Sequence, residues 1–399
     1  MKTATKDKDV SSMHDVAIIG GGLVGASLAL ALQPAGLDVV LVEPQPEPVA
    51  PGVGAWDSRI YAVSPGNVAF LERLGVWSCL DPHRVQRVET MVISGDRRDS
   101  RLQFSAYDAG LPELAYIVES GAMQRAMLEV IAKASGARMI CPAQATGLAI
   151  VENAVRAVLA DGTTLGAQLV VGTDGRDSVV RREAGIDARI SEYRQSGVVA
   201  NFETDKPHHG TAFQWFREEG ILALLPLPGN RVSMVWSTND NHTQALLAMD
   251  AQALAERVFE ASAGVVGRLR LITPALAFPL RLAKVERLVA PRLALAGDAA
   301  HNVHPLAGQG VNLGFRDVRV LAEVLAGRAP RQDCGDLALL RRYERARRED
   351  IAAIAMSTDA LQKLFGSRSV LLSGVRNFGL GALNHLPVLK KLLIQHAAA

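Results

Sequence analysis

Residues 16–25 read VAIIGGGLVG, and this stretch decides the fold. Its apolar start predicts a short buried strand, and a Gly-x-Gly-x-x-Gly pattern at Gly20, Gly22 and Gly25 follows at once. The small apolar residues of 23–32 predict a helix directly after the glycines. Glycines allow a tight turn, close approach of a bound group and close packing of helix on strand. The start of a helix also favours negative charge, so the stretch predicts a phosphate site.

A second apolar strand at Val39–Val42 completes a β-α-β unit and ends at Glu43. Glu43 follows the glycines at the separation where an acidic residue accepts hydrogen bonds from ribose hydroxyls. The prolines of Pro44–Gly54 predict a loop after it. We therefore predict nucleotide binding by this unit. The structural alternative is a glycine-rich turn that only lets the helix pack closely.

Two later strands also end in a carboxylate. Asp174 and Gly175 follow the apolar run Gln168–Gly172, and Asp298 follows the run Leu293–Ala296. Ligand sites of α/β proteins gather at the carboxyl ends of the strands, so both carboxylates are candidate ligand contacts. Asp298 can accept hydrogen bonds from the hydroxyls of a ribityl chain. An Asp-Gly pair in isolation is more often simply a turn.

A helix is predicted over Val311–Leu325, and Gly310 and Asn312 lie at its start. Its free N–H groups and positive dipole end favour anionic charge, which a reduced flavin carries at its N1–C2=O edge. Three such segments, far apart in sequence, predict a single dinucleotide, FAD. A nicotinamide dehydrogenase would not need the second and third segments. A two-dinucleotide disulfide reductase would carry a second fingerprint and usually a C-x-x-C motif.

Composition excludes several classes of protein. The chain has 399 residues, of which 49% are hydrophobic, so it can form a large core. A net charge of only +2 gives no field for nucleic acid. The isolated cysteines Cys79, Cys141 and Cys334 argue against a disulfide framework and for a reducing compartment. No secretory signal and no apolar run long enough for a membrane span are found, so we predict a cytoplasmic protein.

Between about residues 196 and 290, short runs rich in β-branched and aromatic residues alternate with Gly and Pro turns, which is typical of antiparallel strands. A helix is predicted at 251–261 within this region, and another at 336–364 after it. The predicted fold class is α/β: a Rossmann-like FAD-binding domain, an inserted antiparallel-sheet substrate domain and a C-terminal helical region. The predicted boundaries are a flexible tail at 1–14, a discontinuous FAD-binding domain at 15–80, 115–190 and 291–335, a substrate domain at 81–114 and 191–290, and the helical region at 336–399.

Three longer strings narrow the assignment. Residues 298–314 read DAAHNVHPLAGQGVNLG, residues 340–347 read LRRYERAR, and residues 219–227 read EGILALLPL. With the glycine and aspartate segments, they resemble the flavin-dependent aromatic hydroxylases of the para-hydroxybenzoate hydroxylase type, and within these the ubiquinone-biosynthesis hydroxylases. The resemblance covers residues 15–393, nearly the whole chain, and its most specific part is the first string.

The resemblance implies an FAD-dependent monooxygenase that hydroxylates the aromatic ring of a polyprenylated phenol in ubiquinone biosynthesis. NAD(P)H would be a transient co-substrate, and O₂ would react through a C4a-hydroperoxyflavin. Two alternatives stay open: a related FAD monooxygenase acting on another aromatic or isoprenoid substrate, and a non-catalytic flavin-binding member of a biosynthetic complex. Contact with a ubiquinone-biosynthesis complex, or peripheral contact with the inner membrane, is also open. The apolar segment 370–399 could lie on a bilayer, dock on the protein or mediate self-association.

The resemblance also implies roles for individual residues. Gly20, Gly22, Gly25 and Glu43 would bind the ADP half of FAD, Arg59 would lie near its phosphates and ribose, Asp174 with Gly175 would lie near the pyrophosphate and the nicotinamide route, Asp298 would hold the ribityl chain, and Pro305, Gly308, Gly310, Val311, Asn312 and Leu313 would line the isoalloxazine ring. Arg125 is either a ribose contact or a solvated helix residue. Ser120 stands where relatives often carry Gln or Asn, which puts a cofactor contact there in doubt.

No side chain is assigned as a catalytic acid or base, because the flavin performs the oxygen transfer. His301 and His304 have H-x-x-H spacing, but no further ligands cluster with them, so no metal is expected. The aromatic residues Phe213, Trp215 and Phe216 either pack in a core or line a substrate cavity.

Overall fold

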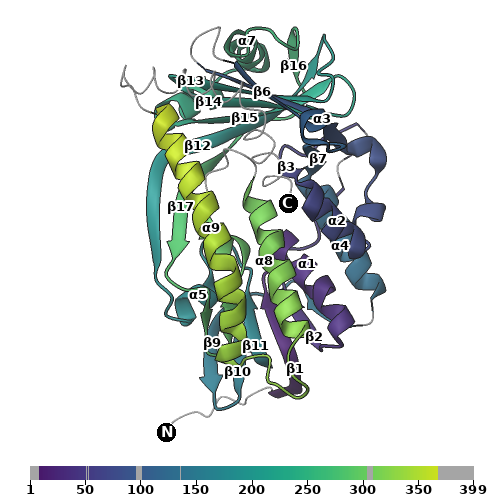
Figure 1. The fold of residues 1–399 in the computed structure, drawn as a ribbon, viewed down its shortest axis with the longest axis vertical. Helices are drawn as coiled ribbons and strands as arrows, with labels where there is room; N and C mark the ends of the chain where they lie inside the picture. The colour runs from purple at the N-terminus through teal and green to yellow at the C-terminus, as the bar shows by residue number, and fades with distance from the viewer. Residues whose placement is uncertain are drawn as a thin grey trace.

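The structure is a computed structural model, and it describes residues 9–50, 52, 54–95, 101–134, 136–302 and 309–366. Figure 1 shows two large sheets toward opposite ends of the long axis, with helices α8 and α9 running lengthwise beside each other. Helix α8 spans Gln309–Ala326 and α9 spans Leu337–Gly366.

The first sheet contains the predicted β-α-β unit. Its strand order is β18-β19-β11-β1-β2-β8, and β10 and β9 extend it from β11. The pairs β1–β2, β1–β11, β2–β8 and β11–β19 are parallel. Continuous apolar runs suit such strands, because helices cover both faces of a parallel sheet. The strands are β1 Asp9–Ile19, β2 Val39–Val42, β8 Ala137–Ile140, β9 Ala145–Val151, β10 Ala154–Leu159, β11 Thr164–Gly172, β18 Val289–Ala290 and β19 Leu293–Leu295.

Helix α1, Leu23–Leu32, packs against α8 at a point where no side chain would fit. A Cβ added to Gly314 of α8 would lie 2.6 Å from Cγ2 of Val24, so only glycine lets the two helices approach this closely. The first eight described side-chain positions after Gly310 are all buried, from Val311 to Val318. Residues 311–318 of α8 therefore lie inside the protein. The remaining α-helices are α2 Pro65–Arg73, α3 Ala106–Ala109, α4 Ser120–Lys133, α5 Val179–Glu183, α6 Asp240–Leu247 and α7 Ala251–Ala261.

The second large sheet has the order β20-β17-β12-β15-β14-β13-β5-β6, and β16 pairs with β12. All its pairs are antiparallel except β13–β5, which is parallel. Buried residues of α6 and α7 pack with those of β12, β14 and β15 in one apolar core. The strands are β5 Thr90–Ser94, β6 Arg101–Ser105, β12 Ala188–Thr204, β13 Thr211–Arg217, β14 Gly220–Leu227, β15 Arg231–Asn239, β16 Leu269–Leu271, β17 Leu276–Val285 and β20 His301–Asn302.

A third sheet, β3-β7-β4, is formed by Ile60–Val63, Ala115–Glu119 and Gln86–Val88. It pairs one strand from the segment predicted as substrate domain with two from the segments predicted as FAD-binding domain. Strand β20 likewise lies in a segment assigned to the FAD-binding domain, but it pairs with β17 of the second sheet. The sheets therefore exchange short strands near the predicted boundaries.

Helices over 23–32 and 251–261 have the bounds that the sequence predicted, and the two helices near 311–325 and 336–364 are confirmed within a few residues. The prediction of a flexible tail at 1–14 is wrong for residues 9–14, because β1 begins at Asp9, and residues 1–8 lie outside the described residues. Met13 and His14 of β1 pair with Gly166 and Ala167 of β11, which satisfies backbone groups that a free tail would leave to water. No helix among the described residues is long and apolar enough to cross a membrane.

Candidate active site

The glycine-rich turn between β1 and α1 requires two of its glycines sterically. Gly20 has a φ of +102°, and a Cβ there would lie 2.5 Å from the carbonyl oxygen of Thr173. A Cβ on Gly25 would lie 1.8 Å from the carbonyl oxygen of Gly20. A Cβ on Gly22 would meet no atom within 4 Å, so this position faces open space. The turn is therefore tightly packed on its protein side and open where a ligand can approach.

The open side of the turn presents the start of α1. Gly22 caps this helix without a side chain, so no side-chain oxygen occupies its first N–H groups. Glu43 lies beside them: its Oε2 accepts a hydrogen bond from Gly21 N at 2.6 Å, and its Oε1 accepts one from Gln45 N at 2.7 Å. A carboxylate has about four lone-pair sites, so Glu43 keeps acceptor capacity for ribose hydroxyls. Free N–H donors and an acidic acceptor together fit the ADP half of a dinucleotide.

Two residues that sequence reasoning missed hold this turn. Thr173 Oγ1 donates to the carbonyl oxygen of Gly20 at 2.6 Å, and Gln124 Nε2 on α4 donates to the carbonyl oxygen of Gly21. Both are remote from the turn in sequence. Thr173 stands in the second predicted segment without an assigned role, and Gln124 belongs to no pattern that would have identified it. The sequence predicted that the segment at 173–175 meets the first segment, and it does so through Thr173.

Asp174, by contrast, is engaged with its own helix. Its carboxylate accepts hydrogen bonds from Ser178 Oγ at 2.5 Å, from Val179 N at 2.7 Å and from Val180 N at 3.3 Å. These are contacts at the start of α5, whose orphan N–H groups need such acceptors. Gly175 has a φ of +78° and makes the turn between Asp174 and this helix.

The third segment forms a single 3₁₀ turn, η4, at Gly297–Ala299. Gly297 has a φ of +61°, and a Cβ there would lie 3.0 Å from Val24 of α1, so the turn lies against the first helix. Asp298 in the middle of η4 is exposed. Arg181 Nη1 donates to the carbonyl oxygen of Ala299 at 2.9 Å, which joins this turn to the segment after β11. The three segments therefore meet, as the sequence predicted.

Tyr61 of β3 lies near both Arg59 and Asp298. Burial, as the largest effect, raises the pKa of Tyr61; Arg59 lowers it, Asp298 raises it, and hydrogen bonds with Ser120 and Arg59 lower it, with a net rise. The Cζ of Arg59 lies 5.4 Å from the Tyr61 ring centroid and 5.9 Å from that of Phe278 on β17. Sequence reasoning selected Arg59 and Asp298 but missed Tyr61, whose place between them arises only in the fold.

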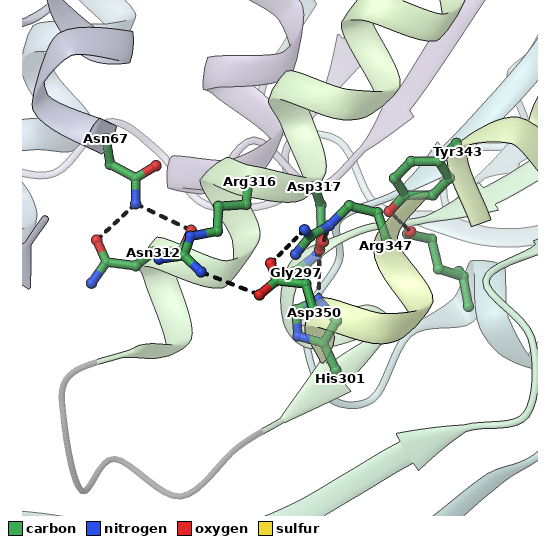
Figure 2. Close-up of polar contacts among 10 residues, drawn as sticks. Asn67, Gly297, His301, Asn312, Arg316, Asp317, Tyr343, Arg347 and Asp350 are labelled. Carbon is green, nitrogen blue, oxygen red and sulfur yellow. Dashed lines mark hydrogen bonds and ion pairs between the residues drawn. The ribbon is translucent and has the colours of Figure 1, made fainter. Parts of the chain in front are cut away.

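At the start of α8, Gly310 faces open space and the side chain of Asn312 points into the protein. A Cβ on Gly310 would meet nothing within 4 Å, so its surroundings are open. Asn312 instead points into the protein: its Oδ1 accepts from Ser64 N at 3.0 Å and from Asn67 Nδ2 at 2.9 Å, and its Nδ2 donates to the carbonyl oxygen of Ala62 at 2.8 Å. Figure 2 shows Asn67 beside Asn312.

The side chains of Val311 and Leu313 are also buried in the core, which leaves backbone rather than side chains for a ring-lining role at these positions. Of the predicted ring-lining residues, Pro305 and Gly308 lie outside the described residues.

Arg125 lies at the proline-rich loop after Glu43. Its Nη1 donates to the carbonyl oxygen of Val49 at 3.4 Å, and its side chain lines a surface pocket of about 480 Å³ with Glu47, Arg84 and Glu129. The contact ties α4 to the proline-rich loop.

Within the described parts of the chain, no group of three or more His, Cys, Asp or Glu residues is placed to hold a metal ion. His301 bonds to Asp317 at 2.6 Å instead, and His304 lies outside the described residues.

Comparison with known proteins places this site in a family. Residues 13–358 match the family model described as the FAD binding domain. The chain is 37% identical to ubiquinone hydroxylase UbiL of Rhodospirillum rubrum, over 99% of this chain and 91% of that protein. It is 33% identical to 3-demethoxyubiquinol 3-hydroxylase of Escherichia coli, over 96% of this chain and 98% of that protein.

A solved structure agrees. PqsL of Pseudomonas aeruginosa, a probable FAD-dependent monooxygenase, is 25% identical, with a TM-score of 0.76 over 93% of this chain and 100% of that chain. The site fits FAD: the glycine-rich turn is tightly packed at Gly20 and Gly25, the start of α1 is uncapped, and Glu43 lies beside it as an acceptor. NAD(P)H is the co-substrate of this class of monooxygenase. The chain therefore belongs to the FAD-dependent monooxygenases, within the family of the ubiquinone-biosynthesis hydroxylases.

Proposed function

We propose that the protein hydroxylates the aromatic ring of a polyprenylated phenol that is a precursor of ubiquinone. One oxygen atom of O₂ enters the ring, the other leaves as water, and NAD(P)H supplies the two electrons. The observation that carries the proposal is an apolar face of the second sheet that begins beside Arg59. Phe278 and Leu276 of β17 are 37% and 45% exposed, although both are large apolar residues.

The pairing of the strands extends this apolar face. Phe278 lies opposite Gly197, and Leu276 lies opposite Val199, on the neighbouring strand β12. Directly opposed residues of antiparallel strands share one face of the sheet, so Phe278, Leu276 and Val199 lie on the same face. Arg59 contacts Phe278 at one end of the row. A polar head at the Asp298–Tyr61–Arg59 cluster and an apolar tail along β17 match a prenylated phenol.

The chain's own residues bind and orient the reactants. The start of α1 and Glu43 hold the pyrophosphate and adenosine ribose, and Asp298 holds the ribityl chain. FAD, when bound, supplies the electron transfer from NAD(P)H and the activation of O₂. Burial moves the pKa of Tyr61 further above neutral pH, so its Oη keeps its proton and can donate a hydrogen bond near Asp298. The exposed end of Gly310 leaves room for a flat ring at the start of α8.

The test is a comparison of substrates with the purified flavoprotein. We expect NAD(P)H oxidation to be stimulated by a short-chain prenylphenol in detergent, with a product heavier by one oxygen atom. Phe278→Ala should raise KM for the prenylphenol more than it lowers kcat. Ile150→Ala on β9 is the matched control, because Ile150 is also an exposed apolar strand residue but lies in the first sheet.

Two results would replace the proposal. Equal stimulation and hydroxylation of para-hydroxybenzoate would favour the related monooxygenase with another substrate. Tight flavin binding with no oxygenated product from any phenol, while binding to other ubiquinone-biosynthesis proteins persists, would favour the non-catalytic member of a complex. Contact with a membrane is a separate prediction, and flotation of the full chain with anionic vesicles tests it.

A further inference from the structure

A buried polar cluster lies against the turn that carries Asp298, on the side of α8 and α9 (Figure 2). Its central residue is Asp317 of α8, which is fully buried. His301 and Arg347 are each 3% exposed. None of these residues has a place in the proposed chemistry, although ionised groups are costly to bury.

Asp317 accepts three hydrogen bonds from three different elements. Its Oδ2 accepts from Gly297 N at 2.9 Å and contacts His301 Nε2 at 2.6 Å, and its Oδ1 accepts from Arg347 Nε at 2.7 Å. Burial is the largest single effect on its pKa and raises it, but His301 and Arg347 together lower the pKa below the ordinary value. Asp317 is therefore ionised, and its bond to Gly297 N is charge-assisted.

A second residue of α9, Tyr343, hydrogen-bonds to the chain just before the same turn. Tyr343 lies one helical turn before Arg347, and its hydroxyl donates to the carbonyl oxygen of Leu295 at 2.8 Å. Leu295 is the last residue of β19, and only Ala296 separates it from the turn at 297–299. Tyr343 is fully buried. One face of α9 thus holds the chain before the turn directly, and holds the first residue of the turn through Asp317.

The guanidinium of Arg347 is also held by a second carboxylate, that of Asp350. Its Nη1 donates to Asp350 Oδ2 at 2.6 Å, and Arg316 Nη1 of α8 donates to Asp350 Oδ1 at 3.3 Å. Alternating charges therefore join α8 and α9. Buried ion pairs give little net stability compared with apolar residues of the same volume, because desolvation offsets their attraction. Their directional hydrogen bonds do fix geometry, and the geometry fixed here is that of the Gly297–Asp298 turn.

We propose that Tyr343 and Arg347 of α9 are positioning residues for FAD binding, which act through Asp317 and Leu295 to hold Asp298 where it meets the ribityl chain. Gly297 has no side chain to restrict its conformation and adopts a φ of +61°, so the turn depends on hydrogen bonds from outside. The C-terminal helix is therefore part of the cofactor site without touching the cofactor. The inference rests on the role proposed above for Asp298.

A double-mutant cycle on the full chain tests it. Flavin is removed from each protein, and the Kd for FAD is measured by quenching of flavin fluorescence. Asp298→Ala should raise the Kd about tenfold, which corresponds to about 1.4 kcal/mol. Tyr343→Phe removes one hydroxyl and keeps the packed ring, and it should raise the Kd about three- to fivefold. In the Asp298→Ala background, the same Tyr343→Phe change should alter the Kd less than twofold.

Two further variants complete the set. Arg347→Gln should raise the Kd at least as much as Tyr343→Phe, and Arg347→Lys should recover part of the affinity. Arg345→Gln is the matched control, because Arg345 is an exposed arginine of the same helix, and its Kd should equal that of the wild type. The melting temperature of each apoprotein establishes that it is folded. If Arg347→Gln does not fold, the Tyr343→Phe cycle decides.

Three outcomes overturn the inference. An unchanged Kd in Tyr343→Phe removes the positioning role of α9. Equal effects of Tyr343→Phe with and without Asp298 show a general structural effect rather than placement of that carboxylate. An unchanged Kd in Asp298→Ala removes the role of Asp298 on which the inference rests. None of these results decides the substrate, which the assay with prenylphenols tests separately.

Discussion

Gly25→Ala separates the two functions of the glycine-rich turn, which are close packing on the protein side and ligand access on the open side. The added Cβ would lie 1.8 Å from the carbonyl oxygen of Gly20 and 2.6 Å from Oγ1 of Thr173. Real Cβ contacts are essentially never shorter than 3.0 Å, so α1 has to move by more than about 1 Å. Such overpacking typically costs about 1–3 kcal/mol of unfolding free energy.

The displacement of α1 also moves its N–H groups away from the phosphates. We expect the Kd for FAD to rise by about 100-fold or more, since that factor corresponds to only about 2.7 kcal/mol. Urea unfolding of the apoprotein measures the loss of stability, and titration with FAD measures the loss of affinity. Gly25→Ala should change both quantities.

Gly22→Ala gives the contrast. Its Cβ would meet no protein atom within 4 Å, and Gly22 has a φ of −62°, which an alanine adopts without strain. The unfolding free energy of the apoprotein should stay within about 0.5 kcal/mol of the wild type, while the affinity for FAD falls. Gly147→Ala on β9, also without neighbours within 4 Å, is the control that should change neither. Wild-type stability and wild-type FAD affinity in Gly25→Ala would refute the geometry of the turn.

Three further predictions test other parts of the site. Glu43→Gln should raise the Kd for FAD about tenfold, because an amide nitrogen cannot accept the hydrogen bonds that the carboxylate takes from Gly21 N and Gln45 N. Isothermal titration measures this Kd, and an unchanged value would remove Glu43 from the ribose site. Asp174→Asn should lower the unfolding free energy in urea by about 1 kcal/mol with less than a twofold change in FAD affinity, because its contacts are to the start of α5; a large loss of affinity would show a direct ligand role. Burial raises the pKa of Asp350, but Arg347 and Arg316 lower it more, so the net pKa lies below the ordinary value. The ionised carboxylate therefore stabilises the protein above about pH 4, and this stabilisation is lost as the pH falls further. The unfolding free energy should depend less steeply on pH in Asp350→Asn, and a slope equal to that of the wild type would contradict this assignment.

Local rules explain why the first part of the site was predictable. The spacing of Gly20, Gly22 and Gly25 places them on one turn wherever a strand is followed directly by a helix. Glu43 is tied to that turn by the short β-α-β connection, so its contact with Gly21 N follows from a few tens of residues of chain. The same applies to helices 23–32 and 251–261, whose amphipathic or apolar patterns and flanking breakers define their ends.

The direction of a carboxylate was not predictable in this way. Asp174 and Asp298 both follow a buried parallel strand, and the residue pattern around them does not distinguish the directions of their carboxylates. In the structure Asp174 turns back to α5, while Asp298 stays exposed near Tyr61. The difference arises because a free helix start lies within reach of Asp174, and its N–H groups compete with any ligand for the carboxylate.

By itself, the sequence determined the β-α-β unit, its glycine-rich turn, the place of Glu43 beside that turn and the choice of a flavin family, because each depends on residues close together in the chain or on a specific string. Only the tertiary structure decided which remote groups complete the site. Thr173 and Gln124 reach the first turn, Tyr61 joins Arg59 to Asp298, and Asp317 links that turn to α9. Apart from the neighbours Arg59 and Tyr61, the residues that meet here are from about 20 to more than 200 positions apart, and no periodicity or spacing in a single chain encodes which of them meet.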